Sequence, residues 1–136
     1  MENENIISKA VVVQKDFAKI YELYEPAFDI DSVSNIRYLV GKNAENNWNI
    51  YRASERSDTI FHLDKFSSPY VIVNVPITEL TTEQIYMAAY LCKLKSKYKS
   101  YNNIGVLYTS ISNTSLGNEI GSFNIKSTGK KKVIHV

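Results

Sequence analysis

Residues 41–75, GKNAENNWNIYRASERSDTIFHLDKFSSPYVIVNV, are the stretch on which the fold of this 136-residue chain depends. A glycine opens the stretch, a polar segment with four asparagines follows, and two β-rich runs close it. The runs Thr59–Leu63 and Tyr70–Val75 are rich in β-branched and aromatic residues, so each predicts a strand. The loop Asp64–Pro69 between them carries polar and charged side chains, and it is therefore a candidate binding loop.

A short helix is predicted just before these two strands. Gly41 permits a turn with positive φ, and Asn43 is a favourable N-cap for a helix over 44–53. Trp48 and Tyr51 stand three residues apart, so they share one face of this helix.

Two further helices are predicted, one on each side of this central stretch. Thr81 and Gln84 have the spacing of a capping box, and small and apolar residues then recur at helical spacing over 82–99. Apolar residues at helical spacing also predict a helix over 14–24, which Pro26 should end. The helix over 82–99 is the longest that we expect.

The rest of the chain is predicted to form short strands joined by hairpins. We expect hairpins of 27–31 with 36–40 and of 121–126 with 131–136, a strand over 104–109, and a polar loop over 110–117. Strands outnumber helices and are mostly joined by hairpins, which is typical of an α+β fold. The expected fold is a mostly antiparallel sheet with one long helix and one or two shorter ones.

Length and composition indicate one domain without a membrane span. No window of about 18 apolar residues is present, so we expect no membrane insertion. The acidic segment MENENIISKAVVV lacks the basic character of an export signal. The single cysteine, Cys92, cannot form an internal disulfide or a Cys-type zinc site. We therefore expect a cytoplasmic protein with no metal and no cofactor, and the sequence gives no prediction of oligomeric state.

Charge is distributed unevenly along the chain. Residues 92–136 carry eight lysines and one acidic residue, Glu119, whereas residues 1–91 carry eight basic and thirteen acidic residues. A basic carboxyl-terminal third on a chain of net charge +2 is typical of a surface that attracts a polyanion. A solvated lysine face in a lysine-rich chain would give the same pattern.

Four groups of residues, in order and at matching spacing, resemble a known family. They are Gly41–Asn47 (GKNAENN), Asp58–Leu63 (DTIFHL), Ser67–Val71 (SSPYV), and Val106–Thr109 (VLYT) followed by Gly121, Ser122 and the closing VIHV. Over about residues 27–136 the chain resembles the RNA-binding domain of the NFACT proteins, which are ribosome quality-control factors. It looks closest to the small branch typified by coiled-coil-domain-containing protein 25.

The chain departs from the family pattern at several points. Ile60 stands where the family usually has tryptophan, and Tyr70 stands where it has histidine. Residues 1–24 match nothing in the family. We assign residues 1–26 to an amino-terminal extension, which leaves 27–136 as the NFACT-like domain. The coiled coil of the small branch and the large amino-terminal domain of the long members have no counterpart in the sequence.

The resemblance implies a module without catalytic activity that binds nucleic acid, with RNA preferred. Its expected partners are transfer or ribosomal RNA, or DNA, in translation or ribosome-associated quality control. The alternative is a protein-interaction module that docks on a ribosomal or other protein partner without touching nucleic acid. Salt dependence separates the two, because phosphate contacts weaken steeply with ionic strength.

The candidate nucleic-acid-binding residues are of three kinds. Some lie in turns that can expose backbone N–H groups, some have side-chain amides, and some are cationic. A glycine turn entering a helix can present N–H groups to phosphate, and asparagine offers both a donor and an acceptor. The alternative interpretation of the polar residues near this turn is that they cap the helix and form a polar face exposed to solvent. The candidates are Lys42, Asn43, Asn46, Asn47, Arg52, His62, Lys65, Ser67, Ser68, Lys93, Lys97, Lys99, Lys130, Lys131 and Lys132.

His62 and the tyrosines of the basic segment leave alternatives open. His62 and Asp64 are two residues apart, so on one strand they would share a face and the carboxylate could orient the ring. A half-buried structural histidine is the other interpretation, and no nucleophile motif accompanies the pair. Tyr98 and Tyr101 alternate with lysines and either stack on bases or pack within the protein.

Overall fold

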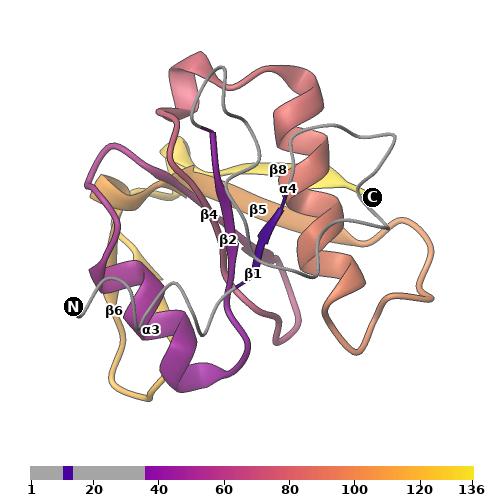
Figure 1. Ribbon diagram of the computed structural model, residues 1–136, viewed down its shortest axis with the longest axis horizontal. Coiled ribbons are helices and arrows are strands. Elements are labelled where there is room, and N and C mark those ends of the chain that lie inside the picture. Colours follow the sequence, from indigo (N-terminus) through magenta and orange to yellow (C-terminus); the bar gives the residue numbers. More distant parts are fainter. Residues whose placement is uncertain (1–10, 14–35) are drawn as a thin grey trace.

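The computed structural model describes residues 11–13 and 36–136 (Figure 1). The helix expected over 14–24 and the strand expected over 27–31 lie outside these residues. A six-stranded sheet forms the centre, and every neighbouring pair of its strands is antiparallel. Its strands in spatial order are β1 (Val11–Val13), β2 (Tyr38–Val40), β4 (Val71–Val73), β3 (Thr59–Leu63), β5 (Gly105–Ser110) and β8 (Lys132–His135). The predicted α+β class with a mostly antiparallel sheet is confirmed.

Both faces of the sheet are covered. Helix α4 (Thr82–Leu94) lies on one face, and helix α3 (Ala44–Arg52) lies on the other (Figure 1). A two-stranded sheet of β6 (Thr114–Leu116) and β7 (Phe123–Ile125) joins α3 on that second face. The described residues thus form three layers, with the six-stranded sheet in the middle.

Successive side chains along the central strands point to opposite faces of the sheet, so the hydrophobic core is divided between the two faces. In β3, Phe61 and Leu63 pack with α4, whereas Ile60 packs with α3. In β4, Val71 packs with α4 and Ile72 packs with α3. A sheet that is buried on both faces needs apolar residues at successive positions, which explains why the β4 sequence is a continuous apolar run.

Helix α3 begins where the sequence predicts. The Asn43 side chain accepts a hydrogen bond from the N–H of Asn46 at 2.7 Å, so it is the N-cap. Trp48 and Tyr51 tie the helix to distant segments. Trp48 Nε1 donates to the Ser122 carbonyl at 2.9 Å, and the hydroxyls of Tyr51 and Thr114 are 2.7 Å apart. The helix therefore anchors the β6–β7 hairpin at two points, the first residue of β6 and the connection just before β7.

Helix α4 begins with the predicted capping box but ends at Leu94, before the expected end at residue 99. Thr81 accepts from the N–H of Gln84, and the Gln84 side chain accepts from the N–H of Thr81. At the other end, Ser96 Oγ donates to the Lys93 carbonyl at 2.7 Å and accepts from the N–H of Tyr98 at 3.0 Å. These side-chain bonds replace the helical ladder and turn the chain away. The single long helix over 82–99 is not confirmed.

The predicted final hairpin is wrong. Strand β7 pairs with β6, and β8 pairs with β5 at the edge of the main sheet. Asn113 explains the difference, because its side chain accepts from the N–H of Ser127 and donates to the Ser127 carbonyl. These two hydrogen bonds hold the end of β7 beside β6. The segment 110–117, expected as a loop, accordingly contains a 3₁₀ turn (Ile111–Asn113) and β6.

Two short 3₁₀ turns complete the described elements. One, Ile77–Glu79, follows Pro76 and leads toward α4, and the other, Thr128–Lys130, leads into β8. No helix in the part of the chain that the structure describes combines the length and apolar character needed to cross a membrane.

Candidate nucleic-acid interface

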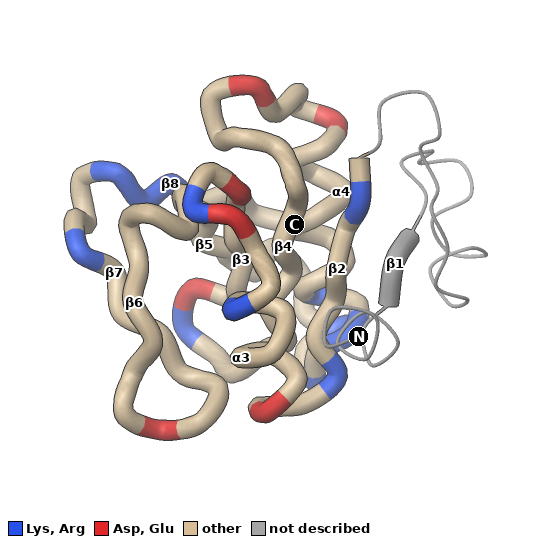
Figure 2. The backbone as a smooth tube through the Cα atoms, turned by 60° about the vertical axis from the view of Figure 1, so that its left-hand side comes forward, with Lys and Arg blue, Asp and Glu red and all other residues tan. Residues whose placement is uncertain are grey.

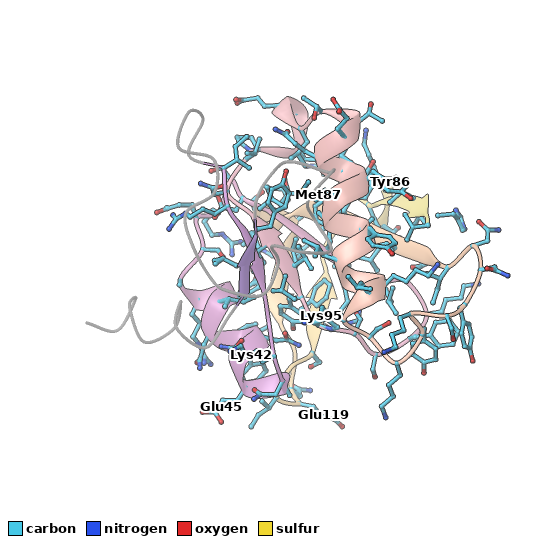
Figure 3. The ribbon with its side chains drawn as sticks, turned by 45° about the vertical axis from the view of Figure 1, so that its right-hand side comes forward. Lys42, Glu45, Tyr86, Met87, Lys95 and Glu119 are labelled. Carbon is cyan, nitrogen blue, oxygen red and sulfur yellow. The ribbon has the colours of Figure 1, made fainter. Side chains whose placement is uncertain are left out.

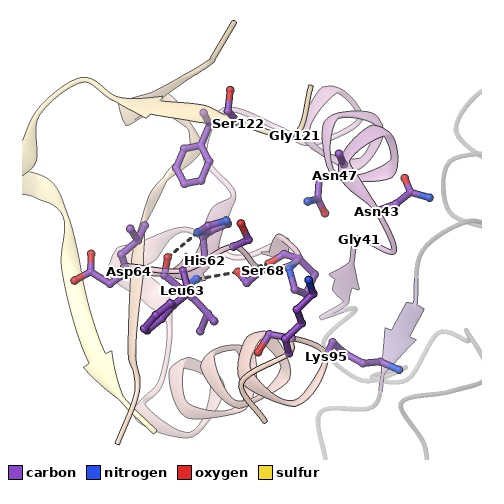
Figure 4. Close-up of a pocket in the computed structure, with 18 of the residues that line it drawn as sticks. Gly41, Asn43, Asn47, His62, Leu63, Asp64, Ser68, Lys95, Gly121 and Ser122 are labelled. Carbon is purple, nitrogen blue, oxygen red and sulfur yellow. Dashed lines mark hydrogen bonds between the residues drawn. The ribbon is translucent and has the colours of Figure 1, made fainter. Parts of the chain in front are cut away.

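An open cavity of about 860 Å³ lies where the sheet face extends beyond the cover of α3 (Figure 4). We call it the polar groove. His62 of β3 and Leu107 of β5 face each other across the antiparallel register, and together with Phe123 of β7 they form its floor. One side is formed by the segment 41–47 at the start of α3, of which residues 41–44 and Asn47 line the cavity, and we call this segment the α3 side. The opposite side, the loop side, consists of residues 64–69 and 95–98.

The asparagines of the α3 side bond mainly to the protein itself. Asn46 Oδ1 accepts from the N–H of Lys42 at 2.9 Å, and Asn47 Oδ1 accepts from the N–H of Tyr70 at 3.0 Å. Their exposed fractions are only 2% and 5%. Asn43, which is exposed, uses its Oδ1 as the helix cap. These amides therefore shape the groove by holding its wall in place.

Backbone N–H groups on the α3 side are also largely engaged. Gly41 donates to the Tyr70 carbonyl at 3.0 Å, and Asn47 donates to the Asn43 carbonyl at 2.8 Å. The N–H groups of Lys42 and Asn46 are bonded to asparagine side chains. The turn thus offers fewer donors to a phosphate than we expect from a glycine turn that enters a helix.

Two glycines allow neighbouring segments of the chain to approach each other closely in this region. A Cβ at Gly41 would overlap the side-chain oxygen of Asn47, and a Cβ at Gly121 would lie 2.7 Å from the Cβ of Ala44. Gly121 also has φ of +90°, which L side chains rarely adopt. Its carbonyl accepts from the Tyr70 hydroxyl at 2.8 Å. The loop of Gly121 is therefore locked against both α3 and the sheet.

His62 is a half-buried ring on the floor, and it is not paired with Asp64. Its Nδ1 lies 2.7 Å from the Leu63 carbonyl (Figure 4). Since a carbonyl can only accept, Nδ1 carries the proton and Nε2 is left as an acceptor. The rings of Tyr70 and Phe123 meet it edge-on at centroid distances of 5.8 and 5.5 Å. Burial lowers the pKa of His62 below its usual value, although the Leu63 bond opposes the shift, so the ring is neutral near pH 7.

Asp64 is directed toward the basic carboxyl-terminal segment instead. Its Oδ1 lies 3.6 Å from Lys131 Nζ, and in Figure 4 its carboxylate points away from the His62 ring. The expected His–Asp pair is therefore absent, because Asp64 follows the last residue of β3 and no longer keeps the alternation of the strand. Lys131 thus forms an ion pair with the Asp64 carboxylate.

The β3–β4 loop presents both fixed and exposed groups. Ser68 Oγ accepts from the N–H of Leu63 and donates to the Pro69 carbonyl, each at 3.0 Å. Lys65 and Ser67 are exposed on the same loop. Ser68 therefore holds the loop, while Lys65 and Ser67 are available to a ligand in the groove.

Eight of the fifteen candidate residues line the polar groove. They come from the turn before α3, the α3 helix, strand β3, the β3–β4 loop and the turn after α4. They are Lys42, Asn43, Asn47, His62, Lys65, Ser67, Ser68 and Lys97. Folding thus brings together residues that are up to 55 positions apart, from Lys42 to Lys97.

The other seven candidates lie elsewhere. Asn46 is buried behind the α3 side, and Arg52 stacks over the Trp48 ring at 5.1 Å from its centroid. Lys93 Nζ donates to the Val136 carbonyl at 3.3 Å, and Lys99 is exposed beyond the groove. The lysines at the 3₁₀ turn that leads into β8 form a separate group. Lys130 and Lys132 line another cavity, beside Asn113, and Lys131 lies with Asp64.

The distribution of charge favours an anionic ligand in the groove. Four lysines line it, Lys42, Lys65, Lys95 and Lys97, against the carboxylates of Asp64 and Glu119. Figure 3 shows Lys42, Lys95 and Glu119 at the same end of the molecule. Figure 2 shows that the basic residues between β7 and β8 stand apart from those beyond the end of α4. The basic third of the sequence therefore splits into two surfaces.

Aromatic residues of the loop side are absent from the candidate set, although they line the groove. Phe66 and Tyr98 face the groove, and Tyr101 packs against both of them. The signal in the sequence is the spacing of Tyr98 and Tyr101 among lysines, which is compatible both with stacking on bases and with packing within the protein. Only the fold shows that these rings meet Phe66 of another loop.

The described residues contain no group of three or more histidine, cysteine or carboxylate side chains that could hold a metal ion. Cys92 is buried, and burial raises the pKa of its thiol well above the usual value. The groove offers ammonium groups, hydroxyls and an imidazole acceptor, all of which can form hydrogen bonds or ion pairs with a ligand.

Two comparisons with known proteins found similarity to this chain. Residues 27–127 match the family described as NFACT protein RNA binding domain. A similar solved structure is the C-terminal part of the fibronectin/fibrinogen-binding protein from Streptococcus suis, with a TM-score of 0.68 and 18% sequence identity. The similarity covers 77% of this chain but only 42% of that one, and at this identity it establishes the fold alone. No curated protein matches the chain.

Proposed function

The chain belongs to the NFACT RNA-binding domain family, and from this premise we propose that its polar groove binds RNA. The observation that carries the proposal is the convergence of three exposed lysines from separate segments. Lys42 precedes α3, Lys65 lies in the β3–β4 loop, and Lys97 follows α4, and all three line the groove. Ammonium groups at such positions contact phosphates and release counterions, which favours binding to a nucleic-acid backbone.

The floor and the loop side of the groove add groups that can contact sugars and bases. The Nε2 of His62 accepts hydrogen bonds, and the hydroxyl of Ser67 both donates and accepts. RNA carries a 2′-hydroxyl that can donate to such an acceptor, and DNA lacks it. This pairing supports RNA over DNA as the ligand.

The experiment is a binding titration by fluorescence anisotropy across a series of salt concentrations. The intact chain is compared with a groove variant, in which Lys42, Lys65 and Lys97 are replaced by alanine. A matched control replaces Lys126, Lys130 and Lys132, which are exposed and do not line the groove. Transfer RNA, single-stranded RNA and duplex DNA serve as ligands.

We expect the groove variant to lower RNA affinity and to reduce the slope of log affinity against log salt by about two to three units. The control variant, which loses the same charge, should change both quantities much less. Equal losses in the two variants would show that the net charge of the chain, and not the groove, attracts RNA. Salt-insensitive or absent binding by the intact chain would favour docking on a protein partner instead.

Within the family, we propose that the chain lies near the small branch typified by coiled-coil-domain-containing protein 25. We also assign it a non-catalytic role in translation or ribosome-associated quality control in the cytoplasm. Sedimentation with ribosomal subunits tests that role. Co-sedimentation at low salt that the groove variant loses would support it, and a chain that stays at the top of the gradient would contradict it.

A further inference from the structure

Three aromatic rings from two loops meet on the loop side of the groove. Phe66 lies 4.4 Å from Tyr98 between ring centroids and 6.2 Å from Tyr101, and the two tyrosine rings are 5.0 Å apart. Phe66 is 38% exposed and Tyr101 is 51% exposed. We call these three residues the aromatic ridge. Their packing fixes the rings in place while large parts of two of them stay in solvent.

The ridge separates two cavities. Phe66 lines both the polar groove and a second cavity of about 520 Å³, and so do its neighbours Asp64 and Lys65. Tyr98 faces the groove, whereas Tyr101 faces the second cavity. A ligand that is longer than one cavity would therefore pass over the ridge.

The loops that carry the ridge are mainly basic. Residues 64–70 and 95–105 contain four lysines and one acidic residue, Asp64, whose carboxylate lies 3.6 Å from Lys131 Nζ. Lys65, Lys97 and Lys99 are exposed beside the rings. Exposed aromatic rings between cations are suited to a ligand that carries both a flat π face and negative charge. An apolar protein surface would match the rings but would leave the ammonium groups to be desolvated.

The second cavity supplies polar groups beyond the ridge. Asn102, Asn103 and His135 line it. Asn103 has φ of +58°, a conformation that asparagine tolerates better than most residues, and the turn that it forms leads directly into β5. Amide and imidazole groups can bond to the edge of a base whose face lies against the ridge.

From these observations we propose that the aromatic ridge stacks unpaired bases, so that a single-stranded stretch of RNA crosses it from the polar groove into the second cavity. The inference rests on the proposed RNA binding and names the form of RNA that is bound. Bases within a duplex are already stacked on one another and present only their edges. The ridge therefore selects single strands, loops or ends.

The test compares a uridine oligonucleotide with a duplex RNA of the same length at one low salt concentration. Tyr101→Ala and Phe66→Ala remove the rings, and Tyr101→Phe keeps the ring but removes the hydroxyl. Tyr86→Ala is the matched control, because Tyr86 is 46% exposed on α4 and lines neither cavity (Figure 3). Thermal unfolding of each variant verifies that it is folded.

We expect Tyr101→Ala and Phe66→Ala each to weaken binding of the single strand by about fivefold or more, with little change for the duplex. Tyr101→Phe and Tyr86→Ala should keep the affinity of the parent chain. Photo-crosslinking of an oligonucleotide that contains 5-iodouridine should place the modified peptide within residues 64–68 or 95–105.

The outcomes separate this inference from the proposed function. If the intact chain binds RNA and the groove variant loses binding, but the ridge variants bind the single strand normally, the inference is overturned and the proposed function stands. Equal losses for duplex and single strand would also overturn it, because they indicate a structural role for the rings. If the intact chain binds neither RNA, both proposals fail together.

Discussion

The two sides of the polar groove differ in how they use their polar groups. On the α3 side, Asn46 and Asn47 are almost fully buried and their side-chain oxygens bond to backbone N–H groups. On the loop side, Lys65, Ser67 and Lys97 are exposed. The α3 side is therefore a scaffold, and the loop side presents most of the groups that a ligand can reach.

This difference shows that the density of polar residues in a sequence does not locate a binding surface. A buried amide that satisfies the backbone stabilises the wall, whereas an exposed ammonium group contributes little to stability. Substitutions on the two sides should therefore have opposite consequences. Changes to the buried asparagines of the α3 side should mainly lower the free energy of unfolding, and changes to the exposed groups of the loop side should mainly lower RNA affinity.

Gly121→Ala should have the largest effect on stability. The new Cβ would lie 2.7 Å from the Cβ and 2.9 Å from the Cα of Ala44, and the residue would have to keep φ near +90°. We expect the free energy of unfolding in urea to fall by about 2–4 kcal/mol. Gly129→Ala is the control, because the nearest atom to its new Cβ is 3.9 Å away. A parent-like stability for Gly121→Ala would show that the loop is not locked against α3.

Asn47→Ala tests the scaffold role of the α3 side directly. It removes the acceptor for the N–H of Tyr70, and Tyr70 is fully buried, so this donor would lose its partner away from water. We expect a loss of about 1–3 kcal/mol in the free energy of unfolding.

Asn49→Ala on the same helix is the control for this prediction. Asn49 is only partly buried, and we expect a change within about 0.5 kcal/mol. If Asn47→Ala left stability unchanged but abolished RNA binding, Asn47 would be a ligand contact and the contrast between the two sides would be wrong.

Local chemistry explains which parts of the fold were predictable. The bounds of β3, the Asn43 cap and the capping box at Thr81 depend on residues within a few positions of one another. The end of α4 was missed because the side chain of Ser96 competes with the helical ladder. The β6–β7 pairing was missed because it depends on Asn113 and Ser127, which are 14 positions apart.

The site was predictable to a lesser degree, for the same reason. Sequence patterns could propose Lys42, Lys65 and Lys97 as cations, and the fold brings them to one groove. They could not show that Asn47 bonds to Tyr70, 23 positions away, or that Lys131 lies with Asp64. The function of an individual polar residue depends on these long-range contacts.

Single lysine substitutions can sharpen the comparison by asking whether RNA touches both sides of the groove. Lys42→Ala removes the exposed ammonium group of the α3 side, and Lys97→Ala removes one from the loop side. If each lysine contacts one phosphate of a single strand, each change should lower the salt slope of RNA binding by about 0.7.

Lys126→Ala is the matched control, because Lys126 is exposed and lines neither the groove nor the second cavity. Its salt slope should equal that of the parent chain. An effect of Lys97→Ala without an effect of Lys42→Ala would confine the RNA backbone to the loop side. The α3 side would then be a wall without contacts to the ligand.

His62 should give the smallest effect, a dependence of stability on pH. Burial holds its folded-state pKa below the value of about 6.5 that the unfolded chain has. Below that pH the unfolded state binds a proton that the folded state does not, so the free energy of unfolding should fall as the pH drops through about 6.5 toward the folded-state pKa. Urea unfolding of the parent chain and of His62→Gln at several pH values measures this, and the variant should lose that part of the slope. His135→Gln, which removes an exposed imidazole, is the control. If His62→Gln kept the full slope, the ring would not be held neutral on the groove floor, and Nε2 would not be the acceptor that the proposed contact with a 2′-hydroxyl requires.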